Sequence, residues 1–434
     1  MNHSIIKQVI IDQLEDIQSF QIIPRDYQFE KNANYILVGL RRGGKSTILY
    51  SLAKNLVRDG MDWSQICYLN FEDDRLLGFE LKDFNDVIGA ANELANGKTI
   101  IYFFDEIQNN EGWEHFARRM ADHHHRVYIS GSNARMLSNE MESVLGGRYL
   151  SKMIMPFSFR EVLRFKKIDS SDAAQLSTVK SAQIRVACER YLHVGGLPDA
   201  QQMDQPREYI KSVYEKVILG DIGEREKIQN KMALRLMVKK IAEVVMHEIS
   251  FSSLAGNVKA AGARCTTDTM IEYAGYAENA YLLFRTRNFF SKFSEKEGIP
   301  RFYFFDNGFL SLFLVNKDSA LLENAVAVML KRNCAEEIYY LKSSQTGVDI
   351  DFYLPESKTA IQVCYSLQDA QEREVRSFSL ALKYSPELIQ NMLIVTYEEE
   401  DMISLDEKHV IRVLPLWKFL LQEKTSLLTG AVSC

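Results

Sequence analysis

Residues 35–46 have the sequence YILVGLRRGGKS, and this stretch decides the fold of the first part of the chain. An apolar run is followed by a glycine-rich turn, which leads into a stretch with helical spacing, residues 47–57. Glycines let the backbone turn tightly, so that successive N–H groups point at one anion at the positive end of a helix. The pattern predicts a phosphate-binding P-loop (Walker A). Its expected members are Gly39, Arg41, Arg42, Gly43, Gly44, Lys45, Ser46 and Thr47.

Lys45 and Ser46 have separate tasks in such a loop. A lysine at this position reaches the β- and γ-phosphates of a nucleoside triphosphate, and the hydroxyl after it ligates Mg²⁺. The structural alternative is a glycine turn that only joins a strand to a helix and binds no phosphate. No residue pattern identifies the base, so the motif alone leaves both ATP and GTP open.

Residues 99–106, TIIYFFDE, form a second motif. A continuous apolar run of this length predicts a buried strand that ends in two carboxylates, at the edge where open α/β sheets bind ligands. We expect Asp105 to orient Mg²⁺ and Glu106 to polarise, or accept a proton from, the attacking water. By itself an Asp-Glu pair after a strand is as typical of a helix cap. Together with the P-loop it indicates a Walker B motif and hydrolysis.

Two further positions are candidates for the same site. The sequence SGSN at 130–133 follows a short apolar run, and Asn133 or Ser132 is expected to contact the γ-phosphate or the water, unless Asn133 only caps a helix. Arg148 follows two glycines, and it could stabilise transition-state charge in its own or a neighbouring subunit. The alternative for Arg148 is a surface salt bridge.

Composition narrows the class of protein. The chain has 434 residues, enough for about two to four domains, and 52 basic against 58 acidic side chains. A net charge of −6 gives no general attraction to nucleic acid or to anionic membranes, so DNA binding would need a local surface. No apolar run is long enough to cross a bilayer, and we expect a cytoplasmic protein. Neither the six cysteines nor the adjacent His123, His124 and His125 have metal-ligand spacing.

The pattern of apolar residues divides the chain. Residues 1–24 predict a helical segment, and 25–165 alternate buried strands (36–38, 66–71, 100–104 and 127–129) with helices, which is the α/β signature of a parallel sheet. Residues 166–181 are serine-rich and predict a loop. The helical region that follows contains two short helices near 251–255 and 266–273, which suggest a helix-turn-helix or winged helix. The last part is α+β, with strands at 338–341, 348–354, 360–365, 392–396 and 410–414 and a hairpin turn at 355–358.

Five segments together resemble bacterial and archaeal AAA-family ATPases that carry a C-terminal restriction-endonuclease-like domain: GLRRGGKS, FFDEIQ, ISGSNARMLSNEMESVLGGRY, MPFSFREVL and YLHVGGLPDA. The resemblance covers nearly the whole chain. It implies an ATPase core at 25–165, a helical lid with a winged-helix-like segment at 166–295, and a nuclease-like domain at 296–434. It also implies ATP as the nucleotide. It does not decide whether the chain forms a homo-oligomeric ring.

The nuclease-like domain departs from the catalytic pattern of its type. PD-(D/E)xK nucleases bring a helix acid, a strand Asp and a Glu-x-Lys pair together around Mg²⁺. The corresponding residues here are Glu323, Asp351, Gln362 and Cys364. A neutral glutamine cannot replace the bridging carboxylate, and a thiol cannot supply the fixed charge of lysine. We therefore predict that this domain does not cut nucleic acid.

Three functions fit these observations. The first is a Mg²⁺-dependent ATPase that works as a molecular switch on a protein partner whose identity the sequence does not give. The second is an ATP-gated DNA-binding or DNA-processing protein that docks through residues 251–273. The third is a nucleotide-binding scaffold with little hydrolysis.

Overall fold

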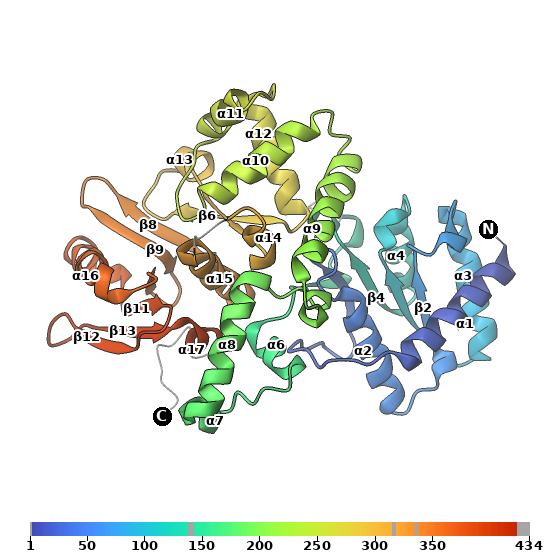
Figure 1. Ribbon diagram of the computed structural model, residues 1–434. Helices are drawn as coiled ribbons and strands as arrows, with labels where there is room; N and C mark the ends of the chain where they lie inside the picture. Colours follow the sequence, from blue (N-terminus) through green and yellow to red (C-terminus); the bar gives the residue numbers. More distant parts are fainter. Residues whose placement is uncertain (1, 138–142, 315–317, 335–336, 423–434) are drawn as a thin grey trace. The chain divides into compact units, whose positions relative to one another are not determined.

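The computed structural model describes residues 2–137, 143–314, 318–334 and 337–422 (Figure 1). Part of the motif ISGSNARMLSNEMESVLGGRY, residues 138–142, lies outside the described residues. The chain divides into two compact units. Unit 1 comprises Met1–Met155 with Asn279–Tyr281, and unit 2 comprises Pro156–Glu278 with Leu282–Cys434. The two are described separately below.

Unit 1 is built on a five-stranded sheet in the order β2-β3-β4-β1-β5, in which every pairing is parallel. This confirms the parallel α/β core expected from the continuous apolar runs. The fifth strand has no such run, because its side chains are half-buried or exposed, and the sequence did not predict it. The strands are β1 (Asn34–Val38), β2 (Ile66–Asn70), β3 (Ile101–Asp105), β4 (Arg126–Gly131) and β5 (Tyr149–Met153).

Helices accompany this sheet, shown in blue and cyan in Figure 1. Each presents an apolar stripe; in α2, for example, Ile48, Leu49 and Ala53 are buried. The N-terminal helix α1 packs against α3 and β2. The helices are α1 (His3–Ser19), α2 (Lys45–Arg58), α3 (Phe84–Ala95) and α4 (Trp113–Asp122).

The strand register brings the expected site residues to one edge of the sheet. Val38 lies opposite Gly131, and Phe104 lies opposite Ile129. The P-loop after β1, the acids at the end of β3 and the polar segment after β4 therefore leave the sheet side by side, since parallel strands share their carboxyl ends.

Unit 2 begins with helices, drawn in green and yellow in Figure 1. The loop or lid connection predicted at 166–181 is non-helical only at 166–171 and at Ser177; Ser171 and Ser177 cap helices, accepting hydrogen bonds from the first turns of α7 and α8. Both short helices expected near 251–273 are present. The helices are α6 (Phe159–Phe165), α7 (Asp172–Leu176), α8 (Thr178–Val194), α9 (Pro206–Lys216) with a π-helical continuation (Val217–Glu224), α10 (Lys231–Glu243), α11 (Phe251–Ala260) and α12 (Thr267–Asn279).

The GGLP element after α8 is explained by close packing within unit 2. A Cβ at Gly195 would lie 1.9 Å from Oδ1 of Asp306, and one at Gly196 would lie 2.1 Å from the carbonyl oxygen of Phe157. The Gly196 N–H donates to Asp306 Oδ2 at 2.7 Å, and the Phe157 N–H donates to the Gly196 carbonyl at 2.7 Å. Any larger residue at either glycine would separate these three segments.

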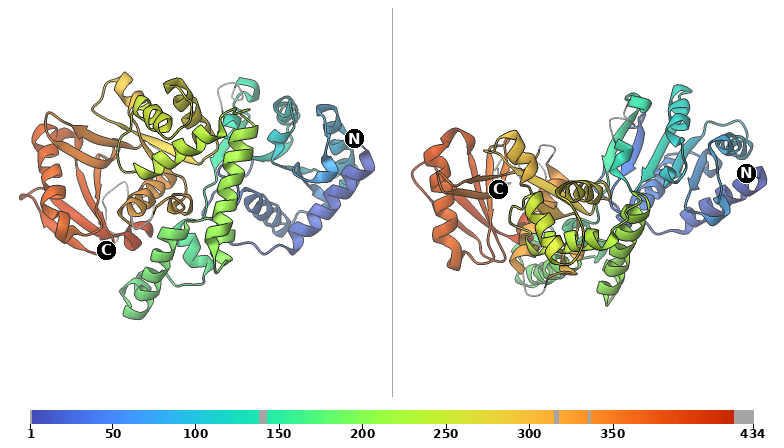
Figure 2. Two further views of the ribbon diagram at one scale, coloured as in Figure 1. Left: turned by 45° about the horizontal axis from the view of Figure 1, so that its top comes forward. Right: turned by 90° about the horizontal axis from the view of Figure 1, so that it is seen from above.

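Unit 2 also contains an eight-stranded mixed sheet in the order β12-β13-β11-β10-β9-β8-β6-β7, of which β8 to β13 are orange and red in Figure 2. The predicted hairpin is confirmed, since β9 and β10 pair antiparallel. The strands are β6 (Leu283–Asn288), β7 (Arg301–Phe304), β8 (Tyr339–Ser343), β9 (Val348–Leu354), β10 (Thr359–Val363), β11 (Asn391–Thr396), β12 (Asp401–Ser404) and β13 (Val410–Pro415). The helices among them are α13 (Phe293–Gly298), α14 (Asn307–Ser311), α15 (Asp318–Asn333), α16 (Leu367–Tyr384) and α17 (Leu416–Leu420).

Within the described ranges, no helix combines the length and the apolar character needed to cross a membrane.

Candidate functional site

The P-loop joins β1 to α2 through backbone that favours glycine. Gly39 has φ +146°, and a Cβ there would lie 2.1 Å from the carbonyl oxygen of Ile154. Gly44, the residue before α2, has φ +100°. Arg25 braces the loop from outside, because its guanidinium donates to the carbonyls of Gly43 and Met155 at 3.3 and 2.7 Å. The loop is therefore held open at the amino end of α2, where unpaired N–H groups attract anions.

Lys45 is buried at the centre of this loop. Its ammonium donates to the carbonyls of Gly39 and Leu40 at 3.1 and 3.2 Å and lies 3.5 Å from Oε1 of Glu106. A lysine is a point charge on a flexible stem, so these partners can be exchanged for phosphate oxygens without moving the backbone.

Asp105, at the end of β3, is fully buried and held by hydroxyl groups. Tyr68 donates to Oδ2 at 2.7 Å and Ser130 donates to Oδ1, and the Ser46 hydroxyl also favours the ionised form of this carboxyl. Burial, together with the neighbouring Glu106 charge, raises the pKa of Asp105 above its ordinary value in spite of these bonds. A nearby cation would reverse that balance and favour the ionised form.

Glu106 follows directly and points toward Lys45. Its backbone is left-handed, with φ +51°, and its N–H donates to Ser130 Oγ at 3.2 Å. Burial by itself would raise the pKa of this carboxyl, but the Lys45 charge and a hydrogen bond from Gln108 outweigh burial and lower it. Glu106 is thus ionised at neutral pH, as a group that polarises water must be.

The remaining P-loop residues line the mouth of the site. Arg41 donates two hydrogen bonds to Glu72 Oε1, both at 3.1 Å, and its charge also acts on Glu106. Arg42 is exposed and left-handed, with φ +61°. Thr47 is half-buried in the first turn of α2. The structure therefore brings all eight predicted P-loop residues to the edge that carries Asp105 and Glu106.

The segment after β4 contributes differently from the prediction. Ser132 and Asn133 are buried there, as expected of residues near the site, and their predicted contact with phosphate or water stays a prediction. The hydroxyl that reaches Asp105 belongs to Ser130. Neither Ser130 nor Tyr68 was assigned a role from the sequence. The usable signal was position, since Tyr68 lies in the middle of β2 and Ser130 near the end of β4, both next to β3, but a serine or tyrosine in a buried strand carries no motif.

Arg148 lies away from these residues within the chain. It directly precedes β5, whose first residue Tyr149 lies opposite Asn34, at the start of β1. The P-loop follows the other end of β1. Arg148 also donates to Asp122 Oδ1 at 2.5 Å. The structure does not bring Arg148 to the phosphate loop of its own chain, and the role in a neighbouring subunit stays a prediction.

The donor set fits a magnesium ion of the kind that accompanies a nucleotide. In the part of the chain that the structure describes, no group of three or more His, Cys, Asp and Glu side chains could hold a metal, and this includes His123, His124 and His125. Mg²⁺ is usually bound through one or two carboxylates together with substrate phosphates. Ser46 and Asp105 would supply the protein's share.

Comparison with known proteins identifies the domain that carries the P-loop. Residues 31–163 match the model of an AAA domain, and residues 185–320 match a domain of unknown function, DUF8612. An uncharacterized protein of Methanocaldococcus jannaschii is 30% identical over 430 residues, which cover 96% of this chain and 95% of the archaeal protein. The chain belongs to the same family as this archaeal protein. Its first part is a P-loop ATPase domain.

A second relative has a less complete match. An uncharacterized protein of Haemophilus influenzae is 29% identical over 343 residues, which cover 74% of this chain and 80% of that protein. Among solved structures, a Walker-type ATPase of Pyrococcus abyssi is 12% identical with a TM-score of 0.43, and the match covers 69% of this chain and 99% of that one.

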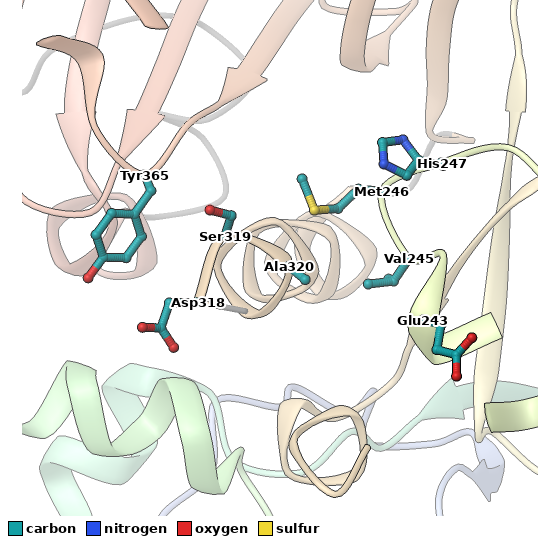
Figure 3. Close-up of a pocket in the computed structure, with 8 residues that line it drawn as sticks. All are labelled: Glu243, Val245, Met246, His247, Asp318, Ser319, Ala320 and Tyr365. Carbon is teal, nitrogen blue, oxygen red and sulfur yellow. The ribbon is translucent and has the colours of Figure 1, made fainter. Parts of the chain in front are cut away.

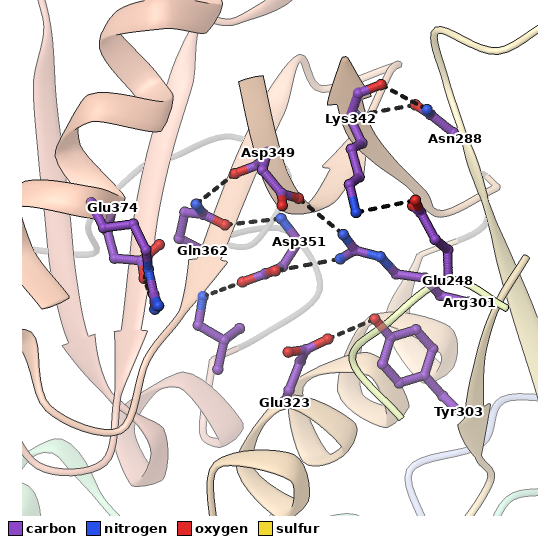
Figure 4. A network of polar contacts seen from close by, with 12 residues as sticks. Glu248, Asn288, Arg301, Tyr303, Glu323, Lys342, Asp349, Asp351, Gln362 and Glu374 are labelled. Carbon is purple, nitrogen blue, oxygen red and sulfur yellow. Dashed lines mark hydrogen bonds and ion pairs between the residues drawn. The ribbon is translucent and has the colours of Figure 1, made fainter. Parts of the chain in front are cut away.

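A second cluster of acids lies in unit 2 (Figure 4). Arg301, only 2% exposed, donates to Oδ1 of Asp349 at 3.0 Å and to Oδ1 of Asp351 at 3.4 Å. The guanidinium also lies over the Tyr340 ring, 4.3 Å from its centroid. One planar cation thus pairs with both aspartates of β9.

The other predicted nuclease positions complete this cluster without metal-binding chemistry. Gln362 donates to the Asp349 carbonyl at 2.8 Å and accepts from the Asp351 N–H at 2.9 Å. Glu323 accepts from Tyr303 Oη at 2.8 Å, and burial with the nearby Asp351 charge raises the pKa of Glu323 to about 8. Cys364 packs in an apolar cluster, and burial raises the pKa of its thiol to about 12. Divalent-metal chemistry does not fit these residues.

Unit 2 also contains a cavity of about 520 Å³ (Figure 3). Glu243, His247, Asp318 and Tyr365 are among the residues that line it. None of the residues that the sequence singled out belongs to this lining.

Proposed function

We propose that this protein binds ATP with Mg²⁺ and hydrolyses it, and that the cycle switches its engagement of a protein partner. The observation that carries this proposal is the meeting of Lys45, Ser46, Asp105 and Glu106 at one edge of the sheet, with the Lys45 ammonium 3.5 Å from Oε1 of Glu106. These are the groups that phosphoryl transfer requires for positioning and charge neutralisation.

Each residue has one task in the proposed reaction. The P-loop amides and Lys45 hold the β- and γ-phosphates, and Ser46 and Asp105 hold the magnesium ion, which would neutralise charge on the phosphate oxygens when bound. Glu106, ionised and buried, polarises the attacking water and accepts its proton. Tyr68 and Ser130 keep the Asp105 carboxylate in one orientation. Asn133 and Ser132 are proposed to contact the γ-phosphate or the water.

Phosphate release tests the enzymatic part of the proposal. We expect the wild-type chain to release phosphate from ATP in a reaction that needs Mg²⁺, and Glu106→Gln to lose at least about a hundredfold in turnover while it keeps its affinity for ATP. Equal, near-zero release by both chains, with intact binding, would instead identify a nucleotide-binding scaffold. A parallel measurement with GTP decides between the two nucleotides.

The helical part of unit 2 is proposed as the lid and partner-binding region. Three helices, α10, α11 and α12, precede the antiparallel pair β6 and β7, and this order supports a winged-helix-like segment. However, α12 contains Asp268, Glu272 and Glu278 and no lysine or arginine. An acidic helix is repelled by DNA phosphates, so a protein partner is the better supported class.

DNA binding is the second proposal for the same segment, because Lys259 and Arg264 lie in the stretch before α12. A shift assay with duplex DNA at several salt concentrations distinguishes the two. Affinity that falls steeply with salt would indicate phosphate contacts and favour DNA. The protein partner is best sought among the proteins that co-purify with Glu106→Gln in the presence of ATP.

The C-terminal sheet of unit 2 is proposed as an inactive nuclease-like domain that serves for docking. Support comes from Arg301, which neutralises the aspartates that a nuclease of this type would use for metal. The full-length protein should leave plasmid and single-stranded DNA intact in Mg²⁺ or Mn²⁺. Cutting that Asp351→Ala abolishes would contradict this assignment.

A further inference from the structure

Gln108 lies in a tight turn directly after the two Walker B acids. The turn, Ile107–Asn109, follows Glu106, and the Asn109 N–H donates to the Glu106 carbonyl at 3.2 Å. Ile107 is fully buried and anchors the turn in the core. The Gln108 side chain therefore starts from fixed backbone beside the site.

One end of the Gln108 amide holds Glu106. Nε2 donates to Glu106 Oε2 at 2.5 Å, while Lys45 lies nearest the other oxygen, Oε1. The donor in this hydrogen bond is the NH₂ group of the amide. Its carbonyl oxygen, Oε1, then necessarily points elsewhere.

The other end of the amide is a buried acceptor. Gln108 Oε1 accepts no hydrogen bond from any residue that the structure describes, although it is inaccessible to solvent. It lies over Gly131, where a Cβ would come within 2.3 Å of it. Gly131 ends β4 opposite Val38, the residue before the P-loop. Buried acceptors are normally paired, so this oxygen is an acceptor for a group that enters the site.

We propose that Gln108 positions the attacking water together with Glu106, an inference that rests on the proposed hydrolysis. One water hydrogen is donated to Glu106 and the other to Gln108 Oε1, which directs the oxygen lone pair at the γ-phosphorus. The new bond forms between the water oxygen and phosphorus, while the bond from phosphorus to the β–γ bridging oxygen breaks. ADP leaves with that electron pair, and Glu106 takes the proton. Gln108 neither gains nor loses a proton.

The test compares Gln108→Ala and the apolar, non-bonding Gln108→Leu with Asn109→Ala, an exposed neighbour in the same turn. We expect both Gln108 variants to lose about 10- to 100-fold in kcat, because misplacing a reactant costs this much. Their KM and their affinity for a non-cleavable ATP analogue should stay within about twofold of wild type. Affinity for ADP with aluminium fluoride, which mimics the transferring phosphoryl group, should fall about tenfold or more. Asn109→Ala should match wild type in every measurement.

The outcomes separate this inference from the proposed function. Wild-type kcat and aluminium fluoride affinity in both Gln108 variants would overturn the role of Gln108 and leave the ATPase intact. An equal loss of ATP-analogue and aluminium fluoride affinity would show that Gln108 only supports the fold, and would also overturn it. A wild-type chain that releases no more phosphate than Glu106→Gln would overturn both proposals together.

Discussion

Each unit brings carboxylates together around one buried cation, and the two cations are held in different ways. In unit 1, Lys45 contacts one carboxylate at 3.5 Å and otherwise bonds to the carbonyls of its own loop. In unit 2, Arg301 bonds two carboxylates and stacks on Tyr340. A flexible ammonium can exchange its partners for a ligand, whereas a guanidinium held by two carboxylates and a tyrosine ring cannot. The same acidic chemistry thus gives a binding site in one unit and a closed structural cluster in the other.

The largest effect is expected at Gly39, the residue that opens the P-loop. In Gly39→Ala the new Cβ would overlap the Ile154 carbonyl, where the closest approach is 2.1 Å. We expect a loss of about 3 kcal/mol or more in the free energy of unfolding of unit 1, and no detectable ATP binding. Urea unfolding and calorimetry measure the two quantities.

Gly60→Ala is the matched control for this change. Gly60 also has positive φ, +110°, but a Cβ there meets no atom within 4 Å. The Gly60→Ala variant should lose only about 1–2 kcal/mol in the free energy of unfolding, the cost of a left-handed backbone for alanine, and should keep its affinity for ATP. Equal loss in both variants would show that backbone strain alone, and not the shape of the loop, explains the need for Gly39.

Substitution of Arg301 tests whether this cation holds the second cluster together. Arg301→Met leaves Asp349 and Asp351 without their cation; Asp349 is solvent-exposed, so we expect the loss to come mainly from the half-buried Asp351 and to be about 1–3 kcal/mol. Hydrogen exchange of the β9 amides should report this loss. Lys342→Met is the control, because its pair with Glu248 at 3.1 Å is partly exposed and is worth less than about 1 kcal/mol. Similar protection in the two variants would mean that Arg301 does not hold the cluster.

The pH dependence of unit 2 sharpens the comparison further. Glu323 has its pKa raised from 4.5 to about 8, so the native state holds a proton that the unfolded chain has lost. Its contribution to stability is complete below pH 4.5 and disappears as the pH rises through about 8. Asp306, with its pKa raised by burial to about 7, acts in the same direction.

Glu323→Gln should therefore gain stability relative to wild type as the pH rises from 5 to 8. Urea midpoints measured for both chains across this range give the difference, from which the Asp306 contribution cancels. A difference that is constant with pH, or that shrinks, would contradict the assignment of a protonated Glu323.

The smallest effect is expected at Arg148. Its partner Asp122 is partly exposed, and the arginine lies at the opposite edge of the sheet from the P-loop. Arg148→Ala should change the affinity of the monomer for ATP by less than about twofold. A loss of turnover that appears only at protein concentrations where the chain self-associates would support the predicted role in a neighbouring subunit.

What the sequence could predict was local. The P-loop and the Walker B acids were found because each is a continuous motif, and the parallel sheet between them follows from apolar runs that leave no exposed face. β5 was missed because an edge strand with exposed side chains lacks that run.

The residues that decide the chemistry of the second cluster could not be found in this way. Arg301 meets Asp349 and Asp351 across about fifty residues of sequence, through the mixed sheet, and no spacing rule connects them. Gln108 stands in the quoted motif FFDEIQ, yet its free carbonyl is visible only once Gly131 is placed beneath it. Arg148 was a candidate for contact with the phosphates because a Gly-Gly-Arg sequence does not show at which edge of the sheet the arginine lies.

Titration calorimetry of a non-cleavable ATP analogue with Mg²⁺ tests the difference between the two cations most directly. The wild-type chain should bind one analogue molecule per site, Lys45→Met should lose about a hundredfold or more in affinity, and Arg301→Met should bind like wild type. Absence of binding to the wild-type chain, or equal affinity in wild type and Lys45→Met, would contradict the account.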